Sequence, residues 1–162
     1  MYFGPVALTA ERPAVLPDSI MDFDTKRVGN VTEIQCMTSF IELGYNVSIP
    51  FGDCERYDFI ADYKGNLLRI QCKTARPSED DSCIEINGRS NKRVKGKCTH
   101  RQYTKEEVDY MATYYKGKCY LIPVEEVGSA KKLRLQESKN NQMERVNFAK
   151  DYELEKVLQR ID

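Results

Sequence analysis

The stretch LLRIQCKTA, residues 67–75, has the character of a β-strand, yet a glutamine and a lysine stand two positions apart within it. Side chains alternate across a strand, so Gln71 and Lys73 share one face while Ile70 lies on the other. Only one of these faces can belong to the apolar core. Lys73 therefore either reaches solvent along its methylenes, as strand lysines often do, or serves a chemical purpose.

A carboxylate comes close to this pair in the expected fold. The segment YDFIADY, residues 57–63, is separated from LLRIQCKTA by the tight turn KGN, in which Gly65 and Asn66 can take positive φ. This pattern predicts a β-hairpin. The hairpin would bring Asp58, at the start of one strand, beside Gln71 and Lys73 on the other, although Asp58 alone could be an ordinary turn residue.

These three groups suit one kind of chemistry. The Asp58 carboxylate and the Gln71 side-chain oxygen are hard oxygen ligands of the type that Mg²⁺ accepts. Such a cation polarises a phosphodiester and lowers the pKa of a bound water, while the Lys73 ammonium would orient that water or neutralise charge developing on phosphorus. The constellation therefore indicates a phosphate-directed site.

The elements that must position this site follow the chain in order. Apolar residues recur at steps of three and four between Lys26 and Gly44, which predicts an amphipathic helix that stops at Gly44. The stripe consists of Val28, Val31, Ile34, Met37 and Ile41, widened by Phe40 and Leu43. Strands are expected at 45–51, 57–63, 67–75 and 83–87.

The second half of the chain predicts a helix and a strand. Thr104 with Glu107 matches a capping box that would open a helix over 104–117, and KCYLIPV, residues 118–124, is typical of a buried strand. A short strand and a weak helix would follow. The whole order favours a mixed α/β layer fold with a helix on either side of one sheet.

Composition bounds the class of protein. The 162 residues suit one domain, which we expect over 26–162 after an N-terminal arm at 1–25. No apolar run is long enough to span a bilayer, and the proline-containing start does not resemble a secretory signal. The six cysteines have no zinc-site spacing, so reduced thiols in a cytoplasmic protein are expected.

Charge is balanced at 25 basic and 25 acidic residues, so only its distribution can indicate a polyanionic partner. The stretch 88–101 carries six Lys or Arg and no acid. It could be a solvated loop, but it follows the phosphate-directed site in sequence and is suited to contact DNA. The residues expected to do so are Arg89, Lys92, Arg93, Lys95 and Lys97. His100 is interpreted as an ordinary loop residue.

With these motifs in order, the sequence resembles the PD-(D/E)XK nucleases. Asp58 matches the first acid of the motif, the triplet from Gln71 to Lys73 matches (D/E)XK, and Glu33 matches the acid that many members place on the first helix. The likeness covers roughly residues 26–150. It is closest to the small branch that includes intron-associated homing endonucleases, in the segments GNVTEIQ, GYNVSIPFGDCERYDFIAD, RIQCKTA, YTKEEVDYMATYY and YLIPVEE.

The resemblance implies a restriction-endonuclease-like core of helix, three strands, helix and strand. It implies a DNA endonuclease that uses Mg²⁺ or Mn²⁺, with Asp58, Gln71 and Glu33 holding the metal and Lys73 completing the catalytic set. Duplex DNA would be the substrate, cut by a homo-oligomer, either a dimer or a tetramer, because one site cuts one strand.

One departure from the family pattern leaves alternatives open. Gln71 stands where the family has its second acid, which removes a negative charge from the metal site. Glu33 could restore the missing carboxylate. A non-catalytic DNA-binding module on the same fold is therefore also consistent with the residues. Within the nuclease class, a Holliday-junction-resolvase-like enzyme is compatible with the residues as well. A small-molecule enzyme is the least favoured, because no glycine-rich phosphate loop or nucleophile motif is present.

Overall fold

The computed structural model describes residues 25–52, 54–94, 97–136 and 146–161, with all side chains except those of residues 91–94 and 97–98. Nearly all of the predicted N-terminal arm, 1–25, and the predicted DNA contact Lys95 lie outside the described residues. The first element is helix α1 (Thr25–Glu42), which agrees with the predicted helix. It is followed by Gly44, whose φ of 87° is the left-handed conformation that commonly ends a helix.

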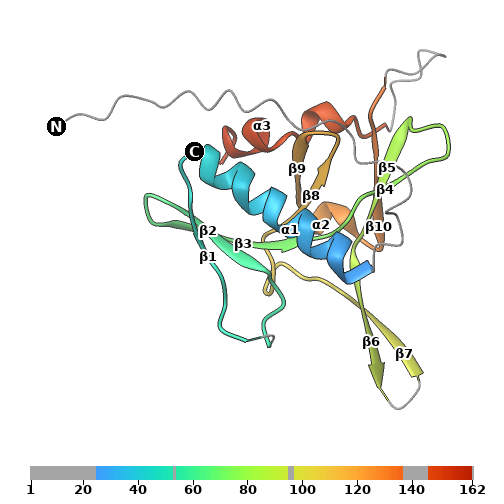
Figure 1. Ribbon diagram of the computed structural model, residues 1–162, viewed down its shortest axis with the longest axis horizontal. Helices are drawn as coiled ribbons and strands as arrows, with labels where there is room; N and C mark the ends of the chain where they lie inside the picture. Colours follow the sequence, from blue (N-terminus) through green and yellow to red (C-terminus); the bar gives the residue numbers. More distant parts are fainter. Residues whose placement is uncertain (1–24, 53, 95–96, 137–145, 162) are drawn as a thin grey trace.

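A five-stranded sheet in the order β1-β2-β3-β8-β9 forms the centre of the molecule (Figure 1). All neighbouring strands are antiparallel except β3 and β8, which run parallel. The strands are β1 (Asn46–Ser48), β2 (Phe59–Tyr63), β3 (Asn66–Cys72), β8 (Tyr110–Tyr115) and β9 (Lys118–Pro123). The mixed sheet confirms the predicted mixed α/β class.

The hairpin between β2 and β3 is present, with one correction at its turn. Tyr63 pairs with Asn66, so the two turn residues are Lys64 and Gly65, with φ of 52° and 86°. The turn pattern predicts positive φ at Gly65 and Asn66 instead. Asn66 is already the first residue of β3, because a two-residue turn matches the twist of the strands that it joins.

The predicted helix over 104–117 is wrong. Residues Thr104 to Glu107 form a single turn, closed by the Val108 N–H donating to the Thr104 carbonyl at 3.0 Å, and the chain then enters strand β8. β8 lies between β3 and β9, so Met111, Ala112 and Thr113 are all buried. A strand covered on both faces has a continuous apolar run that periodicity does not distinguish from a buried helix segment.

A three-stranded sheet packs beside the central one, in the order β10-β5-β4. It consists of β4 (Arg76–Pro77), β5 (Cys83–Asn87), which the sequence predicts at 83–87, and β10 (Ala130–Arg134). The expected weak C-terminal helix is reduced to a short 3-10 helix (Ala149–Asp151) and α3 (Leu154–Leu158). A single turn of helix, α2 (Val124–Val127), follows β9.

The basic stretch 88–101 is not a loop. It forms an antiparallel ribbon of β6 (Arg89–Val94) and β7 (Lys97–Gln102), which is a separate two-stranded sheet that extends from the body (Figure 1). His100, expected in a loop, pairs with Asn91 across this ribbon. The ribbon forms a long arm in place of a coil.

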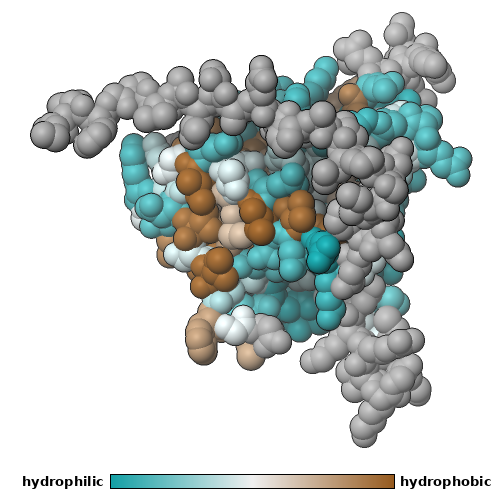
Figure 2. Space-filling model, in the orientation of Figure 1, coloured by the Kyte–Doolittle hydropathy of each residue, from teal (hydrophilic) through white to brown (hydrophobic). Residues whose placement is uncertain are grey.

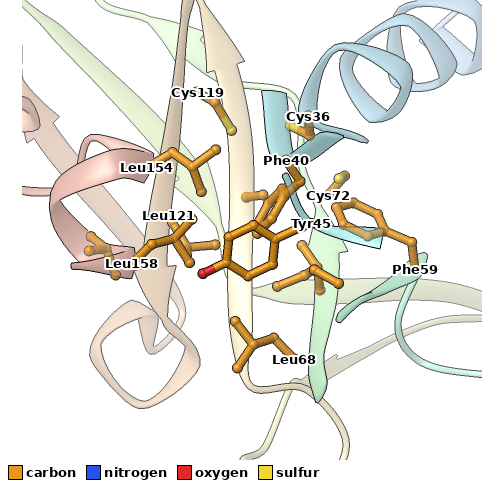
Figure 3. Packing of buried hydrophobic residues seen from close by; sticks show 14 residues of the cluster. Cys36, Phe40, Tyr45, Phe59, Leu68, Cys72, Cys119, Leu121, Leu154 and Leu158 are labelled. Atoms are coloured by element: carbon orange, nitrogen blue, oxygen red, sulfur yellow. The ribbon is translucent and has the colours of Figure 1, made fainter. Parts of the chain in front are cut away.

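Two hydrophobic clusters cover the two faces of the central sheet. On one face, the side chains from α1 and α3 pack on β2, β3, β8 and β9; Figure 3 shows this cluster, with Phe40 and Tyr45 among its labelled members. On the other face, β8 and β9 pack against β5, β10 and α2. Because neighbouring residues of β9 alternate between the clusters, Leu121 belongs to the first and Ile122 to the second.

Helix α1 uses an unexpected face for this packing. Its buried side chains are Thr32, Cys36 and Phe40, each four residues from the next. The apolar stripe noted in the sequence lies largely outside: the side chain of Ile34 is 59% exposed and that of Ile41 is 57% exposed.

The cysteines described in the structure are free thiols. Cys36, Cys72 and Cys119 are buried, whereas Cys54 is exposed, and this agrees with the expectation of reduced cysteines. Within the described part of the chain, no helix is long and apolar enough to cross a membrane.

Candidate active site

A cleft of about 380 Å³ lies where α1 meets the ends of β2 and β3. All four residues that the sequence singled out line it. The helix contributes Glu33, the residue before β2 is Asp58, and the end of β3 contributes Gln71 and Lys73. The remaining lining residues are Lys26, Gly29, Asn30, Cys72 and Thr74.

The β2–β3 hairpin sets the position of Asp58. Its backbone N–H donates to the Ile70 carbonyl at 2.8 Å, which continues the strand pairing one residue beyond β2. The Asp58 Oδ2 atom then accepts two hydrogen bonds of 2.6 Å, one from the Gln71 side-chain amide and one from the Cys72 N–H. The carboxylate is therefore held rigidly against the end of β3, as the predicted hairpin requires.

One backbone contact and one side-chain contact join the end of β3 to β8 and to α1. The Lys73 N–H donates to the Ala112 carbonyl at 2.9 Å, which extends the parallel pairing of β3 with β8 beyond Cys72. The hydroxyls of Thr32 and Thr74 lie 3.3 Å apart, within hydrogen-bonding distance, and join α1 to the same strand end. The parallel β3–β8 pairing is thus what places Lys73 at the mouth of the cleft.

Burial raises the pKa of Asp58 above its ordinary value of 3.8. The Cys72 N–H, the charge of Lys73 and the Gln71 amide oppose this shift without cancelling it. Burial also raises the pKa of Glu33, and the negative charge of Asp58 adds to that effect. A cation would stabilise a site that holds two partly desolvated carboxylates, one of which raises the pKa of the other.

The residues present fit a hard divalent cation. The Gln71 amide nitrogen donates to Asp58 and to the Cys72 carbonyl, which leaves its oxygen as the donor atom for a metal. Asp58 uses Oδ2 for its two hydrogen bonds, and Oδ1 is the oxygen left to a cation. Among the described residues, no group of three or more His, Cys, Asp or Glu side chains could hold a metal ion by itself, and in this cleft the amide of Gln71 lies beside the two carboxylates.

Lys73 has one aromatic and one cationic neighbour that sequence reasoning did not find. The Lys73 ammonium lies 5.0 Å from the centroid of the Tyr103 ring, and the Arg56 guanidinium lies 4.2 Å from the same centroid. Both are within cation–π range. The sequence carries no signal for this contact, since Tyr103 follows the ribbon and Arg56 precedes β2.

Arg56 also ties the site to the base of the ribbon. Its guanidinium donates to the Ser90 hydroxyl at 2.7 Å and to the Gln102 carbonyl at 3.1 Å, which belong to opposite strands of the β6–β7 ribbon. Glu107 pairs with Arg56 at 3.5 Å and also with Arg101. The ribbon therefore leaves the body directly beside the residues that surround Lys73.

Four of the five predicted DNA contacts belong to the strands of the ribbon. Arg89 begins β6, and its guanidinium donates to the Ser129 hydroxyl at 2.5 Å. Lys92 and Arg93 belong to β6 and Lys97 to β7. Arg89, whose side chain is described, does not line the cleft.

The fold is shared with a protein of known structure. A homing endonuclease from a bacterium, I-Ssp6803I, has a solved structure similar to this one, with a TM-score of 0.68, 23% identity, and coverage of 85% of this chain and 95% of that chain. This likeness shows that the fold is the restriction-endonuclease-like one expected from the sequence.

The family follows from the sequence itself. The family model described as PD-(D/E)XK endonuclease matches residues 23–155, so the chain belongs to the PD-(D/E)XK endonuclease family. The resemblance found in the sequence is thereby confirmed, and the protein is an endonuclease that hydrolyses phosphodiester bonds. No curated protein sequence matches the chain.

Proposed function

We propose that the protein is a divalent-metal-dependent endonuclease that cuts duplex DNA at specific sites, as a homing enzyme does. The observation that carries the proposal is that Glu33, Asp58, Gln71 and Lys73 line one cleft. The similarity of fold to a bacterial homing endonuclease supports the homing class over junction resolution. The free cysteines suit a reducing compartment, and we place the protein in the cytoplasm.

Asp58, Gln71 and Glu33 would hold Mg²⁺ or Mn²⁺ through their side-chain oxygens. When bound there, the cation supplies Lewis-acid polarisation of the phosphodiester and lowers the pKa of a coordinated water. Asp58 is already oriented by its two hydrogen bonds, so no side-chain rearrangement is needed before it can act as a ligand. This preorganisation is the contribution of the hairpin.

Lys73 stands beside the carboxylates as a fixed positive charge. Its charge opposes the rise that burial causes in the pKa of Asp58. The same ammonium is positioned to neutralise negative charge that develops on phosphorus in the transition state. The packing against Tyr103 limits the directions in which its long side chain can point.

The basic β6–β7 ribbon favours DNA as the substrate. A two-stranded ribbon is of a size that the major groove admits, and this one carries six Lys or Arg and no acid between residues 88 and 101. Arg89, Lys92, Arg93, Lys95 and Lys97 would contact the DNA. Two or four protomers would act together, because one such site cuts one strand.

The test is cleavage of supercoiled plasmid DNA with Mg²⁺ or Mn²⁺, on a random plasmid and on a library of random sites. The wild type should nick and linearise its target, whereas Lys73→Ala and Asp58→Ala should each lose at least about 10³-fold in rate. Leu67→Ala, an exposed change on the same strand, is the matched control.

Two outcomes would overturn the proposal. Duplex binding that is equal with and without metal, with no cleavage of the library, would identify a DNA-binding module in which Gln71 has disabled the site. Cleavage of a four-way junction but of no linear duplex would assign the protein to the resolvases instead.

A further inference from the structure

Helix α1 carries an apolar stripe that nothing in the described structure covers. The side chains of Val31, Ile34 and Ile41 are 48%, 59% and 57% exposed. Figure 2 shows hydrophobic residues gathered over the helix on the face turned to the viewer. Contiguous apolar surface of this kind marks an interaction site more often than single exposed residues do.

The stripe is additional to the packing of the helix on its own sheet. Thr32, Cys36 and Phe40 already bury the opposite face of α1 in the core. A helix that is apolar on two opposite sides is typically covered on both. The outer side therefore needs an occupant of its own.

The two ends of the stripe carry opposite charges. Arg27 and Glu42 are both exposed, and their separation of fifteen residues is a little over four turns of helix. They therefore lie on the same side of α1 as the stripe, with the basic residue at the start of the helix and the acidic residue at its end.

The charges at the two ends of the stripe attract those of a second α1 helix only when the two helices run antiparallel. A parallel pair of α1 helices would set like charges side by side, whereas an antiparallel pair sets each Arg27 beside the Glu42 of the other copy. The same two-fold register brings Ile34 close to the axis. It also makes the flanking positions face each other in pairs, Val31 with Thr38 and Val28 with Ile41.

We propose that the occupant is a second copy of this chain, which docks through antiparallel α1 helices related by a two-fold axis. Such an interface is isologous, so the same patch serves both partners and the assembly closes as a dimer. Apolar residues form its centre and the two charge pairs form its rim, which is the usual anatomy of a protein interface.

The dimer would have a consequence for cleavage, and this consequence rests on the proposed function. Glu33 neighbours Ile34 on α1 and lines the cleft, so the two clefts would lie on either side of the two-fold axis and close to it. One protomer could then act on each strand of a duplex. Dissociation of the dimer would leave a protein that nicks DNA but does not linearise it.

Sedimentation equilibrium of the full chain tests the interface directly. The wild type should have the mass of two or more 18.7 kDa chains. Ile34→Glu places two like charges near the axis and should weaken association by about 100-fold or more. Leu67→Glu, which changes a side chain of similar exposure on β3, should leave the mass unchanged and is the matched control.

A charge exchange tests the antiparallel register. Arg27→Glu and Glu42→Arg should each weaken association, by about 10-fold, because each replaces two attractive pairs with two repulsive ones. The double variant should recover wild-type association. If the double variant stays as weak as the single ones, the antiparallel register is wrong.

Two results would overturn the interface. A monomeric wild type would do so, and so would an Ile34→Glu variant that keeps the wild-type mass. An unchanged mass combined with a lower Tm for Ile34→Glu would show that the chain's own residues 1–24 cover the stripe. Association that Ile34→Glu abolishes, with no cleavage by the wild type, would uphold the interface and reject the nuclease function.

Discussion

Among the single residues of the site, Asp58 has a raised pKa although its carboxylate is hydrogen-bonded. Its carboxylate accepts two hydrogen bonds of 2.6 Å, yet burial still raises its pKa above 3.8. Hydrogen bonds to a carboxylate normally lower the pKa, so desolvation outweighs them here. The fold therefore holds a carboxylate in a place that disfavours its ionised form.

The sign of the effect on stability follows from linkage. Between pH 3.8 and the raised pKa of Asp58, the folded state binds more protons than the unfolded state, so the free energy of unfolding falls as pH rises. Above the raised pKa, the penalty is constant and fully present. Glu33 acts in the same direction, because its pKa is also raised from 4.5.

We expect Asp58→Asn to be more stable than the wild type at pH 7 in the absence of divalent metal. Asparagine keeps an acceptor oxygen for the Cys72 N–H and the Gln71 amide but cannot ionise. The advantage should shrink towards pH 3, where Asp58 is protonated in both states. Thermal unfolding of the two proteins across pH 3–8 in chelator measures it.

Metal provides the control for that prediction. Mg²⁺ should raise the Tm of the wild type more than that of Asp58→Asn, because only the wild type retains the charged ligand. An Asp58→Asn protein that is less stable than the wild type at every pH would show that desolvation does not govern this carboxylate.

Among the elements of the fold, four segments meet to build the site. The β2–β3 hairpin supplies Asp58 and Gln71, α1 supplies Glu33, and the parallel pairing with β8 fixes Lys73. Tyr103, between the ribbon and β8, packs on the Lys73 ammonium and on Arg56, which in turn bonds both strands of the ribbon. We therefore expect Tyr103 to act as a positioning residue for Lys73.

Replacing the Tyr103 ring should slow cleavage with little effect on DNA affinity. A cation–π interaction of about 0.5–2 kcal/mol corresponds to a decrease of roughly 2- to 30-fold in the single-turnover rate of Tyr103→Leu. Tyr103→Phe keeps the ring and should retain the wild-type rate. Equal rates for the leucine and phenylalanine variants, whether both slow or both normal, would contradict this role.

Across the whole molecule, charge is balanced overall but concentrated locally. The chain has 25 basic and 25 acidic residues, while the ribbon stretch 88–101 holds six of the basic ones and no acid. The ribbon is a separate two-stranded sheet beside the cleft. A polyanion is therefore expected to meet the molecule along the ribbon.

Changing Lys92, Arg93 and Lys97 together to alanine should weaken duplex binding and reduce its salt dependence. Each cation that no longer neutralises a DNA phosphate lowers the slope of log affinity against log salt by about 0.9, so the slope should fall by up to roughly 3. Binding isotherms at several salt concentrations measure it. The matched control replaces the exposed Lys150, Lys156 and Arg160, which lie near the C-terminus.

An unchanged slope in the ribbon variant would place the DNA contacts elsewhere. A slope that falls equally in both variants would show that binding follows total charge and not the ribbon. The expected contrast between the two variants is what assigns the contact surface.

Features of this protein that depend on neighbouring residues in the chain can be predicted from the sequence alone. The hairpin of β2 and β3 follows from a glycine-containing turn between two short apolar segments, and it is enough to bring Asp58 beside Gln71 and Lys73. The first helix and the buried strand β9 were also predictable, because each is specified by its own residues. The family resemblance added Glu33, which the structure places in the same cleft.

Contacts between segments that are distant in the chain decide the features that the sequence did not predict. A segment with a capping box became strand β8, because pairing with β3 on one side and β9 on the other outweighs a local preference for helix. Which face of α1 is buried depends on the sheet beneath it. The contacts of the Tyr103 ring with Lys73 and with Arg56 join segments far apart in the chain. No local pattern encodes a contact that exists only once the chain has folded.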